Sequence, residues 1–376
     1  MIQFRDLGAQ YQAMKEDIDA GIQNVISTSH FISGPQVRML EEKLAEYVGV
    51  RHCITCANGT DAIKLGLMAW KIGPGDAVFV PDFTFFSSGE CPADLGARPV
   101  FVDVDDRTYN MDPQKLEQAI INIIEEGKNI PRAVVAVDLF GLPADYDRIK
   151  PICRKYNLLL LEDGAQGFGG SIRGKKACGF GDISTTSFFP AKPLGCYGDG
   201  GAIFTDDDDW AALIHSYCVH GKNKEDKYNN VRIGMNSRLD TIQAAVLLTK
   251  LRAFQEYELE AVNRVASLYN EMLRDSGALV PEINDGFVSS WAQYTIQIKN
   301  GRDYVQEKLR EVGIPSMVYY PKPMHLQGAF SETVSVFADC KVSERLCKTV
   351  LSLPMHPYLE NETVRTIASV VKSLLQ

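Results

Sequence analysis

The 376-residue sequence predicts an α/β protein with a mostly parallel central sheet flanked by helices and a smaller C-terminal α/β domain. Two observations lead to this prediction. Between residues 52 and 161, short apolar runs alternate with helical patterns, which is typical of βαβ units around a largely parallel sheet. Further along the chain this alternation gives way to a different order of elements. We therefore expect a large domain in residues 1–250 and a small domain in residues 251–376.

The elements of the large domain follow in order. Two amphipathic helices are expected at residues 11–28 and 36–48, ahead of the first strand. The expected strands are residues 52–57, 77–80, 99–102, 133–137 and 158–161. The helices between them are expected at residues 60–70, 85–93, 113–125 and 145–156.

The small domain begins after a long helical pattern. Residues 239–270 contain few helix breakers, so we expect a helix that joins the two domains. The elements expected beyond it are a strand at residues 294–298, a helix at 303–312, a strand near Met317, and helices at 343–350 and 362–375.

Composition excludes several classes of protein. Hydrophobic residues make up 45% of the chain and charged residues 23%, as in ordinary soluble proteins. The net charge of −9 argues against nucleic acid or an anionic membrane as a partner, so an anionic ligand must meet a local positive site. Because no apolar run is long enough to span a membrane and the first residues lack a signal-peptide pattern, we expect a cytoplasmic protein.

The cysteines predict thiols rather than disulfides. There are nine, scattered along the chain, and an odd number in a chain of this size is typical of reduced cysteines. Cys53 and Cys56 have the spacing of a redox or zinc motif, but no second Cys/His pair completes a metal site. We therefore expect buried thiols and no metal.

Residues 184–204 are the most informative stretch. The apolar run Ser187–Pro190 stops at Lys192 and Pro193, and a glycine-rich segment then leads to a second apolar run. Pro193 removes a backbone donor and restricts the residue before it, while the glycines allow the backbone to approach a ligand closely. A lysine amine at such a break suits a Schiff base with an aldehyde cofactor. A surface lysine in a turn is the alternative.

Two other segments have features of ligand sites. Residues 58–62 follow a strand and open a helix, so their free N–H groups and the Thr60 hydroxyl suit a phosphate. An Asn or Thr before a helix can also be a simple helix cap. Asp163 follows an apolar strand, at the edge where α/β sheets bind ligands. A carboxylate there is costly unless it meets a cation, which a protonated pyridine nitrogen would supply. A satisfied structural acid is the alternative.

Other cofactor motifs fit poorly. Residues 167–170 are similar to a dinucleotide-binding glycine pattern, but they lie too late after their strand and no acidic ribose contact follows. The sequence contains no Walker lysine, no Gly-x-Ser-x-Gly and no His-Glu-x-x-His.

In chain order, the phosphate-binding segment, Phe85, Asp163 and Lys192 match the phosphate, ring face, ring nitrogen and aldehyde of pyridoxal 5′-phosphate. The chain resembles the DegT/DnrJ/EryC1/StrS family of nucleotide-sugar aminotransferases, which have the fold-type I architecture. The resemblance extends over nearly the whole chain. Its most specific segments are Ala57–Asp61, Glu162–Gln166, Ser187–Lys192 and Gly234–Asp240.

The resemblance implies a role for each matching residue. Lys192 would form the Schiff base and Asp163 would pair with the pyridinium. Gln166 would bond the ring hydroxyl and Phe85 would stack on the ring. The residues implied to hold the phosphate are Gly59, Thr60 and Ser187, joined by Asn236 of a neighbouring subunit. This last contact implies a homodimer with shared sites.

The resemblance also implies a substrate. Residues 187–205 and 236–240 are most similar to a branch that uses L-glutamate to aminate C3 of UDP-2-acetamido-2-deoxy-3-oxo-glucuronate for bacterial surface polysaccharide such as O-antigen. Arg238 would meet the uronate carboxylate, unless it forms a salt bridge at a helix start. The residues implied to contact the sugar nucleotide are Tyr319, Tyr320 and His325. His325 departs from this branch and matches others, so the sugar stays open.

Three alternatives remain. One is an aminotransferase that acts at C3 or C4 of another UDP- or dTDP-linked keto-sugar. A sugar 3-dehydratase of the same fold is disfavoured, because that enzyme carries histidine in place of Lys192. A binding or regulatory protein without turnover would not need Asp163 and Lys192 together.

Overall fold

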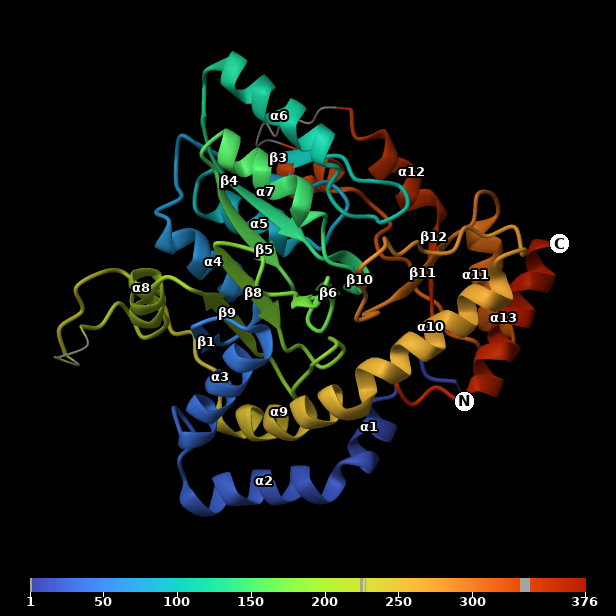
Figure 1. The fold of residues 1–376 in the computed structure, drawn as a ribbon, viewed down its shortest axis with the longest axis horizontal. Coiled ribbons are helices and arrows are strands. Elements are labelled where there is room, and N and C mark those ends of the chain that lie inside the picture. Colours follow the sequence, from blue (N-terminus) through green and yellow to red (C-terminus); the bar gives the residue numbers. More distant parts are fainter. Residues whose placement is uncertain (1, 224–225, 227, 332–338) are drawn as a thin grey trace.

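The computed structural model describes residues 2–223, 226, 228–331 and 339–376. Within these residues, a seven-stranded sheet forms the centre of the molecule (Figure 1). Its strands, in order across the sheet, are β1 (His52–Cys56), β9 (Gly201–Thr205), β8 (Ile183–Ser187), β5 (Leu159–Asp163), β4 (Ile130–Val137), β2 (Asp76–Pro81) and β3 (Arg98–Val102). In this sheet β9 runs antiparallel to the two strands beside it, β1 and β8, and all other pairs are parallel. The predicted mostly parallel sheet is therefore confirmed.

Helices cover both faces of the sheet because its strands are apolar on both sides. Along β2, Val78 and Val80 pack into one core with α4 (Gly59–Ala69), α5 (Ser87–Asp94) and α8 (Asp208–Cys218). The alternate residues, Ala77 and Phe79, pack into a second core with α6 (Pro113–Glu126) and α7 (Tyr146–Lys155). This alternation is the period of two that a strand imposes on its side chains.

A long helical segment connects the sheet to the C-terminal part of the chain (Figure 1). It consists of α9 (Thr241–Ala253), a π-helical turn (Phe254–Glu258) and α10 (Leu259–Leu273), close to the predicted span. The C-terminal part pairs β11 (Tyr294–Gln297) with β12 (Val350–Leu353) beside α11 (Arg302–Glu311), α12 (Lys341–Thr349) and α13 (Asn361–Leu375). This is the expected smaller α/β domain, and its boundary at residue 250 stays a prediction.

The remaining elements are short or peripheral. They are α1 (Leu7–Ala13), α2 (Lys15–Thr28), α3 (Pro35–Val48), β6 (Ser171–Ile172), β7 (Lys175–Lys176), β10 (Phe287–Val288) and the 3-10 turns Leu139–Gly141, Met324–Leu326 and Gly328–Phe330. No helix among the described residues combines the length and apolar character that crossing a bilayer requires. All nine cysteines are buried and unbridged, so the predicted buried thiols are confirmed.

Three details of the structure were not expected from the sequence. In the apolar run Ser187–Pro190 only Ser187 belongs to a strand, because β8 ends there and the chain then turns into a loop in which the Cys196 N–H donates to the Phe188 carbonyl. Met317 forms one bridge to Ser352 rather than a strand. The strand β12 was not predicted at all.

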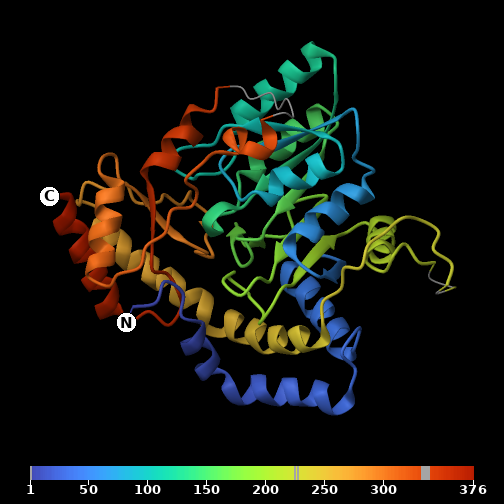
Figure 2. The same ribbon diagram turned by 180° about the vertical axis from the view of Figure 1, so that it is seen from behind.

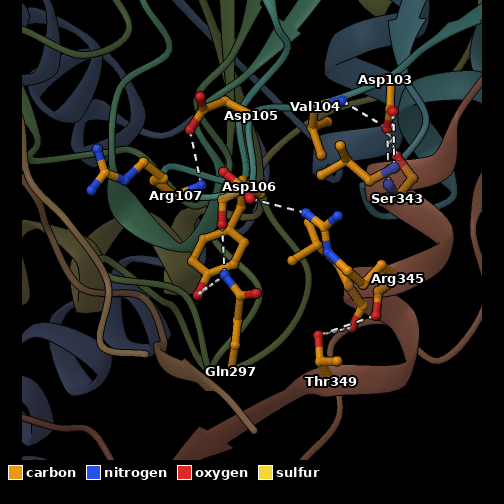
Figure 3. Close-up of polar contacts among 12 residues, drawn as sticks. Asp103, Val104, Asp105, Asp106, Arg107, Gln297, Ser343, Arg345 and Thr349 are labelled. Carbon is orange, nitrogen blue, oxygen red and sulfur yellow. Dashed lines mark hydrogen bonds and ion pairs between the residues drawn. The ribbon is translucent and has the colours of Figure 1, made fainter. Parts of the chain in front are cut away.

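The segment after β3 holds the C-terminal part against the sheet (Figure 3). Asp103 accepts hydrogen bonds from the Val342 and Ser343 N–H groups at 2.9 and 2.8 Å, at the start of α12. The Asp106 carboxylate accepts from Arg345 at 2.9 Å, and its carbonyl accepts from Gln297 at 2.6 Å. These contacts fix the position of the small domain relative to the strand ends.

Candidate active site

A cavity of about 440 Å³ lies at the carboxyl ends of the central strands. Its wall includes most of the predicted site residues. These are Gly59, Thr60, Phe85, Asp163, Gln166, Ser187, Lys192, Tyr319 and Tyr320. They come from both parts of the chain, so the cavity depends on how the two parts pack.

The start of α4 forms one end of this cavity. Asn58 caps the helix, because its side chain accepts a hydrogen bond from the Asp61 N–H at 2.8 Å. As the first helical residues, Gly59 and Thr60 have N–H groups without partners inside the helix. A Cβ on Gly59 would lie 2.7 Å from the Ser187 Cβ, so only glycine allows β8 and α4 to approach this closely. The result is an anion site at a helix N-terminus.

Asp163 lies in the cavity wall at the end of β5 and is 5% exposed. Burial raises its pKa, whereas the hydrogen bond from the Ser88 hydroxyl to Oδ2, at 2.8 Å, lowers it. The Ala165 N–H donates to Oδ1 at 3.2 Å. A buried carboxylate that is held ionised needs a cation, and a protonated ring nitrogen would be one.

Lys192 reaches the cavity from the loop after β8. Burial lowers the pKa of its amine, the Asp163 carboxylate raises it, and Arg5 lowers it. Its own main chain is held on both sides, since its N–H donates to the Phe189 carbonyl at 2.8 Å and its carbonyl accepts from Arg5 at 2.9 Å. A fixed amine with a lowered pKa suits attack on an aldehyde.

Gln166 and two aromatic residues complete the wall. The Gln166 amide donates to the Tyr320 hydroxyl at 3.1 Å and accepts from the Phe140 N–H at 2.8 Å. The Phe85 ring lies 6.3 Å from the Tyr320 ring and is 52% exposed, which leaves its face available to a flat ligand. Anion site, buried carboxylate, amine and open aromatic face together fit pyridoxal phosphate.

Asn236 and Arg238 lie outside this wall. Between them, the Ser237 hydroxyl donates to Asp61 at 2.6 Å and accepts from the Ala57 N–H at 3.1 Å, so the turn is fixed to the start of α4. Asn236 is exposed, and the Arg238 Nε is buried without a partner among the described residues. Neither side chain contributes to the cavity of its own chain.

His325 also lies outside the wall and is buried against Asp82. Its Nδ1 lies 2.7 Å from Oδ2 of Asp82, and its N–H donates to Oδ1 at 2.9 Å. Cys340 completes a group with metal-ligand chemistry, but both Asp82 oxygens already bond His325. The predicted sugar contact of His325 stays a prediction that this placement does not favour.

Sequence reasoning missed three residues at this site. Ser88 orients Asp163, Arg5 bonds Lys192, and Gln293 lines the cavity with its Oε1 buried and unpartnered among the described residues. Two of these residues have weak sequence features that could have indicated a role. Ser88 lies in a Ser-Ser pair close to Phe85, and Arg5 is a cation near apolar residues. Gln293 left none.

A lysine amine, a buried aspartate and a helix N-terminus suited to a phosphate line one cavity. On this fold, these groups define a transferase that uses pyridoxal phosphate. The chain belongs to the DegT/DnrJ/EryC1/StrS aminotransferase family, whose sequence profile matches residues 12–372. It is 45% identical, over 99% of both chains, to the UDP-2-acetamido-2-deoxy-3-oxo-D-glucuronate aminotransferase of Pseudomonas aeruginosa.

Two solved structures extend this comparison. A DegT/DnrJ/EryC1/StrS aminotransferase from Brucella abortus is 49% identical with a TM-score of 0.97, covering 100% of this chain and 99% of its own. DesV from S. venezuelae, solved with a ketimine intermediate, is 31% identical with a TM-score of 0.93, covering 100% and 98%. The protein is therefore a sugar aminotransferase with pyridoxal phosphate as its cofactor.

Proposed function

We propose that this enzyme transfers the amino group of L-glutamate to C3 of UDP-2-acetamido-2-deoxy-3-oxo-glucuronate. The observation that carries the proposal is the 45% identity, over nearly the full length, to the P. aeruginosa enzyme of that name. In the net reaction, glutamate becomes 2-oxoglutarate and the sugar carbonyl becomes an amine. The amino group and its hydrogen exchange for one oxygen, so no outside oxidant or reductant is needed.

The residues of the cavity divide this work. Pyridoxal phosphate supplies an electron sink for the bond-breaking at the amino-acid α-carbon. Asp163, whose carboxylate is held by Ser88 and Ala165, would keep a proton on the ring nitrogen of the bound cofactor. With the amino donor bound, the Lys192 amine would act as a base inside the cavity and move the proton at the reacting carbon. The start of α4 holds the phosphate.

We further propose that the active unit is a homodimer with shared sites. Ile32 and Asp240 form a bridge, which places the exposed Phe31 and Ile32 beside the turn that contains Asn236 and Arg238. Ile233, in the same turn, is 89% exposed. Apolar side chains exposed together favour a protein partner, and a second copy would carry Arg238 toward a substrate anion.

Product analysis tests the substrate. The purified enzyme is loaded with pyridoxal phosphate and glutamate, and then offered a panel of 3-keto and 4-keto sugars linked to UDP or dTDP. We expect turnover with the UDP-linked 3-keto uronate to exceed that with the UDP-linked 3-keto sugar that lacks the carboxylate by at least tenfold. Equal turnover with the neutral sugar, or preference for a 4-keto sugar, would refute the proposed substrate while leaving the aminotransferase intact.

A further inference from the structure

The first residues of the chain lie between the two parts of the molecule, close to the C-terminal part in both views (Figures 1 and 2). We define residues 2–6 as the N-terminal strap. Ile2 packs against the C-terminal core, and the Phe4 carbonyl accepts a hydrogen bond from the Met355 N–H at 3.2 Å. The Phe4 ring lies 6.2 Å from the ring of Tyr319, which lines the cavity. The strap is therefore fixed directly behind the active site.

Arg5 is the charged residue of the strap that reaches the catalytic loop. Its Nη2 donates to the carbonyl of Lys192 at 2.9 Å, and its Nη1 donates to the carbonyl of Ala292 at 3.4 Å. Ala292 immediately precedes Gln293 of the cavity wall. One planar guanidinium thus joins the loop that carries the lysine to the C-terminal part of the chain.

The charge of Arg5 is retained at this half-buried position. Burial lowers the pKa of the guanidinium to about 10, and Glu258 and Tyr319 oppose this effect, so Arg5 is a cation at neutral pH. Glu258 is itself held in place, because its Oε1 accepts from Gln10 at 2.9 Å and from Tyr358 at 2.7 Å. An uncharged hydrogen-bond donor would satisfy the carbonyls of Lys192 and Ala292 without bringing a positive charge close to Lys192.

We propose that Arg5 is a positioning residue for Lys192, fixing the lysine carbonyl and placing a positive charge against the main chain of that residue. The proposal rests on Lys192 as the cofactor-binding lysine and is independent of which sugar is aminated. The two parts of this role are separable. The hydrogen bond from Arg5 fixes the main chain from which the Lys192 side chain extends. The positive charge of Arg5 disfavours protonation of the Lys192 nitrogen.

Asp163 and Arg5 are the charged groups that act on Lys192 with opposite sign. Removing the Arg5 charge leaves Asp163 unopposed, so the lysine nitrogen should hold its proton to higher pH. An opposite or like charge at close range shifts a pKa by about 1 unit or more. This shift can be read in the holoenzyme, because the visible absorption of the lysine-bound cofactor changes when that nitrogen loses its proton.

The experiment compares Arg5→Met, Arg5→Gln and Arg5→Lys with the wild type by titrating this visible band. We expect the midpoint to rise by ~1 pH unit in the Met and Gln variants and to stay near wild type in the Lys variant. All three should react with glutamate roughly tenfold more slowly, because each loses the planar fork. If Arg5→Met does not fold, Arg5→Gln carries the same test, since it removes the charge and keeps a donor.

Arg302 provides the matched control. It is a second little-exposed arginine, and its Nη1 donates to the Val350 carbonyl at 2.8 Å and to the Cys347 carbonyl at 3.4 Å, away from the cavity wall. Arg302→Met should lower thermal stability and leave the midpoint unchanged. An unchanged midpoint in both neutral Arg5 variants, or an equal shift in Arg302→Met, would show that Arg5 is only structural. A wild type without the visible band would instead refute the cofactor-binding role of Lys192.

Discussion

The hydroxyl of Ser88 donates a hydrogen bond to the carboxylate of Asp163 at 2.8 Å, and both groups are buried. Ser88 lies in the first turn of α5 and Asp163 at the end of β5, so the contact joins a helix to a strand that ends in the cavity wall. Because the hydrogen bond favours the ionised form while burial disfavours it, Ser88 helps Asp163 to remain a carboxylate.

Asp163→Asn should therefore lower turnover far more than cofactor affinity. The ring nitrogen loses its counter-charge, and we expect kcat to fall by roughly 10² to 10³, which corresponds to about 3 to 4 kcal/mol. Ser88→Ala removes one hydrogen bond that favours the ionised form of Asp163, so it should give a smaller loss of turnover. Steady-state rates and cofactor titration measure the two effects. Near-normal turnover of the Asn variant would mean that Asp163 is structural.

Lys192→Ala should abolish turnover and leave a folded protein, because the amine is the nucleophile for the cofactor aldehyde. Borohydride reduction of the wild type followed by peptide mapping should place the adduct on Lys192. Circular dichroism of the variant checks the fold. An adduct on any other lysine would contradict this assignment.

Gln293→Leu should weaken the binding of the sugar nucleotide and leave stability equal or higher. Its Oε1 is a buried acceptor without a partner among the described residues, so replacing it removes a desolvation cost in the free enzyme. A lost hydrogen bond to substrate should cost about 1 kcal/mol, or roughly fivefold in affinity. Calorimetry with an unreactive sugar nucleotide measures the affinity, and a thermal melt measures the stability. Reduced stability with unchanged affinity would make Gln293 a packing residue.

Lys250 should make unfolding depend on pH above neutrality. Burial lowers its pKa to about 8 from an ordinary 10.5, although its amine donates to the Gly195 carbonyl at 2.8 Å. Between these two values the unfolded chain binds more protons than the folded one, so this residue's contribution to stability rises with pH through that window. The rise should amount to about 3 kcal/mol and be absent in Lys250→Met. Urea titrations of both proteins across this range would show parallel curves if the prediction is wrong.

Mixing inactive chains tests the shared site. Lys192→Ala chains and Arg238→Ala chains are combined under conditions that allow subunit exchange. If Arg238 serves the neighbouring subunit, one site in each heterodimer regains both groups, and part of the activity returns. Mass spectrometry of the mixed dimers confirms exchange. Zero activity after confirmed exchange would place both residues in the same site.

The sequence predicted the sheet and the main cofactor residues because both depend on local patterns. Apolar runs such as Leu159–Leu161 and the motif around Lys192 can be recognised within a few residues. What it could not predict depends on contacts between distant segments. The strand β12 follows α12 without a break, and only its pairing with β11 marks it as a strand. Gln293 enters the cavity only through the packing of the two parts.

The same reasoning explains why Arg5 left little signal. Its partners, the carbonyls of Lys192 and Ala292, are separated from it by 187 and 287 residues along the chain. His325 shows the opposite case. The resemblance implied a sugar contact for His325, but its side chain lies against Asp82, which directly follows β2, and no local pattern connects the two residues.

The hydrogen bond between the Phe4 carbonyl and the Met355 N–H sets an order of events during synthesis. Gly59, Thr60, Ser187 and Lys192 have all been translated before Met355 is made. Phe4 is therefore translated long before its hydrogen-bond partner. Until Met355 has been made, the strap lacks this partner, so its place beside Lys192 depends on residues translated long after the lysine itself.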